Sequence, residues 1–117
     1  MTWFDAEARE WATCPMTESG FLRIISHPSY PGHVDGVEAA ISLLREQCTV
    51  RGWRFWPEDV SILDVIVPDA TIAHSQITGL YLLGLAAHKG GRLATLDSRI
   101  NASAVRGGRE ALFVIPV

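Results

Sequence analysis

The chain combines two patterns of hydrophobic and polar positions, one typical of helices and one typical of strands. Apolar residues recur every three to four positions in four segments, which predicts helices over residues 4–14, 17–27, 35–51 and 75–89. Short runs that are apolar or aromatic at almost every position predict strands over residues 53–56, 92–96 and 111–117. Strands without polar alternation are typical of a parallel sheet covered on both faces, so this order of elements predicts an α/β fold.

Two of the predicted helices begin with recognisable capping residues. Thr17 is predicted to cap the second helix, which places Glu18 in its first turn. The helix dipole favours a carboxylate there by roughly 0.3–1 kcal/mol, so a capping role and a functional role are both open for Glu18. Asp35, with Glu38 three residues later, predicts the start of the third helix.

The last predicted helix and the strand after it contain two residues that raise a question of function. Gly79 lies in the helix interior, where glycine costs about 1 kcal/mol relative to alanine. Asp97 follows the apolar run RLATL, and ligands of open α/β sheets bind beyond the carboxyl ends of strands. Aspartate is also a common turn residue, so position alone leaves a structural role for Asp97 open.

Composition predicts a single compact domain over residues 1–117. The chain has 117 residues, of which 48% are hydrophobic and 20% charged, and this is enough apolar mass for one core. The formal net charge of -3 gives no overall attraction for phosphate, so contact with nucleic acid would need a local arginine cluster. Four arginines near the C-terminal end could form such a cluster or lie scattered in solvent: Arg92, Arg99, Arg106 and Arg109.

The cysteines and the lengths of the apolar runs bear on where the protein works. Cys14 and Cys48 lie far apart, and neither a CxxC motif nor a secretory leader is evident. We therefore expect two reduced thiols in a cytoplasmic protein, without metal bound through cysteine. No apolar run reaches the ~20 residues of a membrane span, so we expect a soluble protein.

Four segments of the sequence together resemble one protein family. They are CPMTESGFLRIISHP, FWPEDVSILD, HSQITGLYLLGLAAHKGGRLATLDSRI and ALFVIPV, in this order and at similar spacing over essentially the whole chain. This combination is similar to the VapC-type PIN-domain ribonucleases, the toxins of bacterial type II toxin–antitoxin pairs. The resemblance implies a PIN-like three-layer α/β/α domain with a small parallel sheet, in which clustered acidic side chains hold Mg²⁺ or Mn²⁺ and cut RNA. It also implies a cognate antitoxin that blocks the cleft.

The resemblance gives two residues a metal-binding and catalytic role. Glu18 in TESGFLR matches the acid near the start of that helix, and Asp97 in LATLD matches the family's last acid. The family's first aspartate lies on an N-terminal central strand that nothing in this sequence matches, so we expect an N-terminally truncated PIN-like domain. The third family acid aligns with Gly79 in HSQITGLYLL, so two of four acids are missing and weak metal binding is expected. Thr17 and Thr78 are expected to be hydroxyls that support the ligands or cap helices.

Carboxylates suit this chemistry for a physical reason. Phosphodiester hydrolysis requires neutralised phosphate charge and a hydroxide generated near neutral pH, and a metal held by oxygen ligands supplies both. Asp64 and Asp69 are weak candidates to replace the missing acids, because loop aspartates are common. His74 matches a family histidine, but a lone histidine at a helix start is more often a structural donor.

Three functions remain open from the sequence. The first is an active metal-dependent endoribonuclease whose true start lies upstream, and the second is a degenerate family member with little or no cleavage activity. The third is a protein-binding module that retains the antitoxin-facing or dimer-forming surface. Loss of a central strand would expose backbone donors and acceptors on its neighbours, so we also expect lower stability or association, for example as a homodimer.

Overall fold

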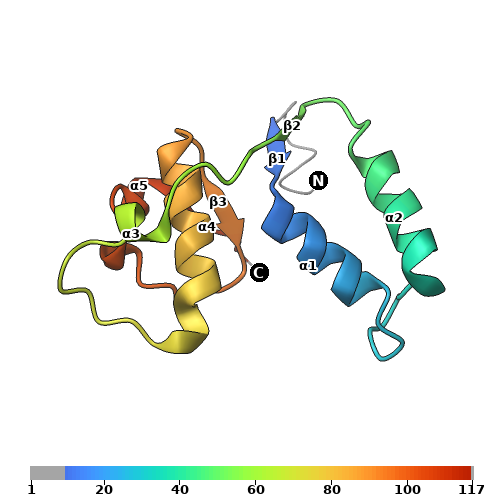
Figure 1. Ribbon diagram of the computed structural model, residues 1–117, viewed down its shortest axis with the longest axis horizontal. Coiled ribbons are helices and arrows are strands. Elements are labelled where there is room, and N and C mark those ends of the chain that lie inside the picture. The colour runs from blue at the N-terminus through green and yellow to red at the C-terminus, as the bar shows by residue number, and fades with distance from the viewer. Residues whose placement is uncertain (1–9, 117) are drawn as a thin grey trace. The chain divides into compact units, whose positions relative to one another are not determined.

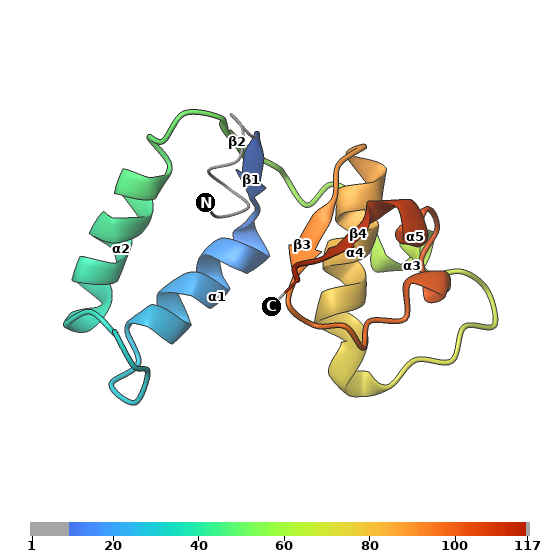
Figure 2. The same cartoon turned by 180° about the vertical axis from the view of Figure 1, so that it is seen from behind.

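A computed structural model of the chain describes residues 10–116. It divides into two compact units, residues 1–57 and 58–117, and each is described by itself (Figures 1 and 2). Both units contain helices and a small parallel sheet, so the predicted α/β class is confirmed. The organisation as one domain stays a prediction. The expected absence of the family's first central strand concerns the chain before residue 10 and also stays a prediction.

The first unit joins two parallel strands through two helices. β1 (Trp11–Thr13) pairs with β2 (Trp53–Phe55), with Trp11 opposite Trp53 and Thr13 opposite Phe55. α1 (Pro15–Ile25) follows β1 directly and contacts α2 (Gly36–Gln47), which leads back toward β2 (Figure 1). Parallel strands need such a crossover, because a tight turn cannot bring their ends together.

The helix predicted over residues 4–14 is wrong for residues 11–13, which form β1. Residues 4–9 of that prediction lie outside the described residues. Trp and Thr suit strands, and the segment pairs with the aromatic β2, so tertiary pairing overrides the local helical spacing. The strand predicted over residues 53–56 is confirmed as β2.

The start of α1 differs from the prediction by three residues. Cys14, a buried thiol, is the N-cap; Pro15 occupies the first helical position, and Thr17 lies inside the first turn. Thr17 Oγ1 accepts a hydrogen bond from Cys14 N at 2.9 Å and donates to Cys14 O at 3.0 Å. Proline favours the first helical position, which places the N-cap at Cys14 rather than at Thr17. Thr17 stabilises the helix start through its two hydrogen bonds to the backbone of Cys14. Asp35 is the N-cap of α2 as predicted, although its side chain makes no capping hydrogen bond.

The second unit is built around one apolar helix. Its elements are α3 (Ile62–Val65), η1 (His74–Gln76), α4 (Ile77–His88), β3 (Leu93–Thr95), η2 (Ala102–Ala104), α5 (Gly108–Ala111) and β4 (Leu112–Val114). β3 and β4 are parallel, with Leu93 opposite Leu112. The long helix and both strands were predicted, whereas η2 and α5 were not.

The core of the second unit gathers on α4. Leu80 and Leu83 pack with Ala104, Val105 and Ala111 of the C-terminal segments. Six of the twelve residues of α4 are buried, more than in α3 or α5 of this unit. β3 and β4 are half-buried rather than covered on both faces, and Val114 is exposed. Among the described residues each of these strands pairs with the other alone. No helix within residues 10–116 is both long enough and apolar enough to cross a bilayer.

Candidate functional site

Glu18 is held at the point where β1 passes into α1. The residue lies in the first turn of α1, as predicted, and its amide donates to Cys14 O at 2.9 Å. Its carboxylate is fixed from outside the helix, because the Thr13 hydroxyl donates to Glu18 Oε2 at 2.6 Å. Thr13 is the last residue of β1, so the strand end positions the acid.

A third residue completes this arrangement from the other strand. The indole Nε1 of Trp53, the first residue of β2, donates to Thr13 Oγ1 at 3.0 Å. Neither Thr13 nor Trp53 was singled out from the sequence. They are 40 residues apart, so the only signal that could have joined them is the pairing of β1 with β2.

Asp97 lies two residues beyond β3 and is held by its own neighbours. Its amide donates to Thr95 Oγ1 at 3.1 Å. Its Oδ1 accepts from the backbone N–H of Arg99 at 2.9 Å and lies 3.3 Å from Arg99 Nε. These contacts, the backbone hydrogen bond first, lower the pKa of Asp97 from its ordinary value of 3.8. The side chain remains 35% exposed, so a ligand can reach the carboxylate.

Gly79 lies in the first turn of α4 and has room for a side chain. A Cβ built there would meet Ile100 Cδ1 at 3.6 Å, an ordinary van der Waals contact, and no other side chain approaches as closely. β3 runs back along α4, so the strand end that leads to Asp97 returns toward the half of the helix that contains Gly79 (Figure 1). Ile100 follows Asp97 by three residues, which links the glycine to the same loop.

The two matched acids belong to different units. Glu18 and Thr17 lie in the first, and Asp97, Gly79 and Thr78 in the second. The Thr17 hydroxyl is engaged with Cys14, and Thr78 is exposed on α4. Within residues 10–116, no group of three or more His, Cys, Asp or Glu side chains could hold a metal ion. The donor set of each unit is therefore one matched carboxylate, and a joint role for Glu18 and Asp97 stays a prediction.

A cavity of about 780 Å³ lies elsewhere in the second unit, against the C-terminal half of α4. Of the four arginines considered as a cluster, Arg92 and Arg106 line this cavity together, whereas Arg99 pairs with Asp97 and Arg109 of α5 is not part of the lining. Neither Asp97 nor Gly79 is part of its wall, so within the second unit the cavity is separate from these two family positions.

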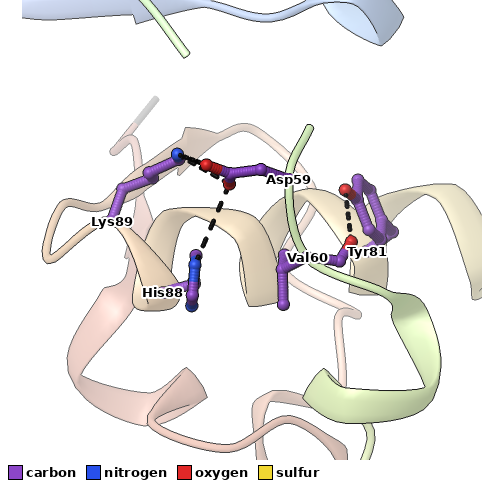
Figure 3. A network of polar contacts seen from close by, with 5 residues as sticks. All are labelled: Asp59, Val60, Tyr81, His88 and Lys89. Carbon is purple, nitrogen blue, oxygen red and sulfur yellow. Dashed lines mark hydrogen bonds and ion pairs between the residues drawn. The ribbon is translucent and has the colours of Figure 1, made fainter. Parts of the chain in front are cut away.

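An ion pair secures the chain beside this cavity. Lys89 Nζ lies 2.7 Å from Asp59 Oδ1 and 2.8 Å from Oδ2, with His88 Nε2 at 3.9 Å from Oδ1 (Figure 3). The hydrogen bond from Lys89 is the largest cause of the lowered pKa of Asp59. Tyr81 donates from its hydroxyl to Val60 O at 2.9 Å, so two contacts fasten residues 59–60 to α4.

The two acids considered as replacements occupy unremarkable positions. Asp64 lies in α3 and lines the cavity, and Asp69 is exposed in the following loop with a left-handed φ of 65°. Neither makes a recorded hydrogen bond to Asp97 within the described part of the chain. Their lack of a catalytic role stays a prediction.

Comparison with known proteins identifies relatives over most of the chain. Ribonuclease VapC44 of Mycobacterium tuberculosis (strain ATCC 25618 / H37Rv) is 45% identical over 101 residues, which cover 85% of this chain and 70% of VapC44. Ribonuclease VapC38 of the same strain is 39% identical over 99 residues, covering 84% and 70% of the two chains. Ribonuclease VapC39 is 36% identical over 113 residues, covering 94% and 81%. No protein-family model and no solved structure matches the chain. The expected resemblance is nevertheless confirmed by these relatives, and the chain belongs to the VapC-type PIN-domain ribonuclease family.

Proposed function

We propose that the chain is a metal-dependent endoribonuclease, the toxin of a type II toxin–antitoxin pair, with Glu18 and Asp97 as its remaining acidic site residues. The observation that carries the proposal is the 45% identity to a protein named a ribonuclease over 85% of the chain. The geometry supports it, because both matched acids are held in fixed positions by hydrogen bonds. RNA is the proposed substrate, an antitoxin protein the proposed partner, and the cytoplasm the proposed location.

Glu18 and Asp97 are the residues that would hold Mg²⁺ or Mn²⁺. Mg²⁺ commonly takes one or two protein carboxylates and completes its shell with waters and phosphate oxygens, so a carboxylate is the kind of ligand such an ion takes. A bound ion would neutralise phosphate charge and lower the pKa of a water molecule. Gly79 supplies no oxygen, so we expect weaker affinity than in a relative with aspartate there.

The chain's own side chains prepare these acids in different ways. Thr13 occupies Oε2 of Glu18, and Arg99 occupies Oδ1 of Asp97. One oxygen of each carboxylate therefore serves to orient the side chain, and the other makes no hydrogen bond within residues 10–116. The Arg99 contacts lower the pKa of Asp97 and so favour its ionised form, which is the form that binds cations.

A second candidate function follows from one position. Gly79 fills a family acid site with no side chain, which favours a catalytically impaired member that acts as a protein-binding module, alone or as a homodimer. In that case the chain would keep the surface that binds the antitoxin and would have lost its cleavage activity.

RNA cleavage by the purified chain distinguishes the two candidates. We expect Mg²⁺- or Mn²⁺-dependent cleavage that Asp97→Asn lowers by at least about 100-fold, because the substitution removes a metal ligand. Asp35→Asn is the matched control: it removes the same charge at an exposed helix cap where asparagine serves equally well.

Two results would contradict the ribonuclease proposal. One is cleavage that Asp97→Asn leaves unchanged, since a contaminating nuclease would then be the source. The other is no cleavage by the purified chain, freed of any partner, at any metal concentration, although sedimentation of a separate sample shows that the chain forms a complex with a co-expressed neighbouring protein. That result would favour the binding module, and a stable free monomer without a partner would argue against the module.

A further inference from the structure

We propose that Thr13 is a positioning residue for Glu18 and that Trp53 fixes the direction in which the Thr13 hydroxyl acts. The catalytic meaning of this inference rests on the proposed function, whereas its structural part concerns the first unit alone. Trp53 Nε1 lies 3.0 Å from Thr13 Oγ1, and Thr13 Oγ1 lies 2.6 Å from Glu18 Oε2. We call this set of three residues the Trp53–Thr13–Glu18 relay.

The chemistry of the three groups gives the relay one direction. An indole N–H can only donate, so Thr13 Oγ1 must accept from Trp53. A hydroxyl has a single proton, and here it points to the nearest remaining acceptor, Glu18 Oε2. The separation of 2.6 Å between Thr13 Oγ1 and Glu18 Oε2 is short for a hydrogen bond between two oxygen atoms.

Strand register explains why Trp53 can reach Thr13. Residues two apart on a strand point to the same face, so Trp53 and Phe55 of β2 share a face. Phe55 is the partner of Thr13 across the parallel ladder. Trp53 is therefore a diagonal neighbour of Thr13 on that face, and the long indole spans the gap.

The relay leaves Glu18 with one oxygen for an incoming ligand. Oε2 is occupied by Thr13, and Oε1 makes no recorded hydrogen bond with any residue of the described range 10–116. A glutamate side chain in solution samples many rotamers, and holding one of them in advance reduces the entropy lost when a ligand binds. Thr13 thus acts on the reaction through Glu18 and does not touch the substrate.

Nuclear magnetic resonance of the metal-free, RNA-free full chain tests the relay directly. The indole N–H signal of Trp53 is assigned by its disappearance in Trp53→Phe. We expect Glu18→Gln to shift this signal, and we expect the same substitution to leave it in place when Thr13 is already valine. A Trp53 signal that does not respond to Glu18→Gln in the otherwise unchanged chain would overturn the relay.

Cleavage kinetics test the positioning role. Thr13→Val keeps the shape of the side chain and removes the hydroxyl, so we expect kcat to fall by about 10- to 100-fold with little change in KM, as for other partners that orient a ligand. Thr13→Ser should restore most of the rate. Thr49→Val is the matched control, because the Thr49 hydroxyl donates to Glu46 O on the exposed end of α2.

The outcomes separate the relay from the proposed function. An unchanged rate in Thr13→Val would overturn the positioning role. If Thr13→Val does not fold, Trp53→Phe replaces it. This variant keeps the Thr13 hydroxyl and removes the indole N–H that fixes the direction in which the hydroxyl donates. An unchanged rate in Trp53→Phe would also overturn the positioning role. A Trp53 signal that responds to Glu18→Gln in a chain without any cleavage would support the relay and contradict the ribonuclease proposal.

Discussion

The two halves of α4 each contain a glycine, and packing requires glycine in only one of them. At Gly84, in the C-terminal half, a Cβ would lie 2.5 Å from Val65 Cβ, closer than real atoms approach. At Gly79, in the N-terminal half, a Cβ would lie 3.6 Å from Ile100 and fit without adjustment. Packing of α3 against α4 therefore requires Gly84, while nothing in the scaffold requires Gly79.

The two halves of α4 therefore differ in what packing requires of them. The C-terminal half packs closely against α3, and Lys89, the C-cap of α4, forms the ion pair with Asp59; both contacts hold neighbouring segments in place. The N-terminal half faces the loop that follows β3, where Asp97 lies. A glycine that packing does not explain is consistent with a lost side chain whose former role was functional.

The largest expected effect is on stability at Gly84. Gly84→Ala should lower the free energy of unfolding by about 1–3 kcal/mol, because the new methyl group overlaps Val65 and the helices must separate. Urea denaturation followed by circular dichroism measures this change.

Gly79→Ala is the matched control on the same helix. It should raise the free energy of unfolding by about 0.4–1 kcal/mol, because alanine restricts the unfolded chain and fits the available space. Equal effects at the two positions, of either sign, would contradict the proposed division of α4.

The next effect is on metal affinity at Gly79. Gly79→Asp should strengthen Mn²⁺ binding by about tenfold, or 1.4 kcal/mol, because it adds a carboxylate near the loop that carries Asp97. Isothermal titration measures it, with Gly79→Asn as a control that matches the size of aspartate but lacks its charge. Unchanged affinity in Gly79→Asp would show that this half of α4 no longer belongs to a metal site.

The smallest effect is on the pH dependence of stability at the other end of α4. Lys89 lowers the pKa of Asp59 below its ordinary value of 3.8 in the folded chain. The stability that ionised Asp59 contributes is therefore complete above that value and is lost as pH falls through the lower folded-state pKa. Melting temperatures between pH 6 and pH 2 should fall less steeply in Asp59→Asn. Identical slopes would mean that the exposed pair contributes nothing measurable.

The sequence alone predicted what local patterns encode. The α/β class, α4, β3 and the position of Asp97 follow from apolar runs and a strand end. The hydrogen bonds of Asp97 within residues 10–116 come from residues no more than two positions away. The metal-site role proposed for Glu18 rests on the family resemblance alone, whereas its place in the first turn of α1 was predicted from the helix spacing.

What holds Glu18 could not be predicted in the same way. Its hydroxyl partner lies on a segment whose spacing suggested a helix, and the indole behind that hydroxyl lies 40 residues further on. Both contacts depend on the parallel pairing of β1 and β2, which is a tertiary choice rather than a local preference. The cap of α1 differs from the prediction for a local reason, because Pro15 favours the first helical position and so places the N-cap at Cys14 rather than at Thr17.

The buried thiol of Cys14 makes the turn that carries Glu18 observable by chemistry. The chain has two cysteines, both in the first unit, and residues 58–117 contain none. Cys14 is 4% exposed, so an alkylating reagent can reach it only while the β1–α1 junction is open. The rate at which Cys14 is alkylated therefore measures the rate of local opening at that junction. The half-buried Cys48 serves as an internal reference, and the second unit contributes no signal because it contains no cysteine.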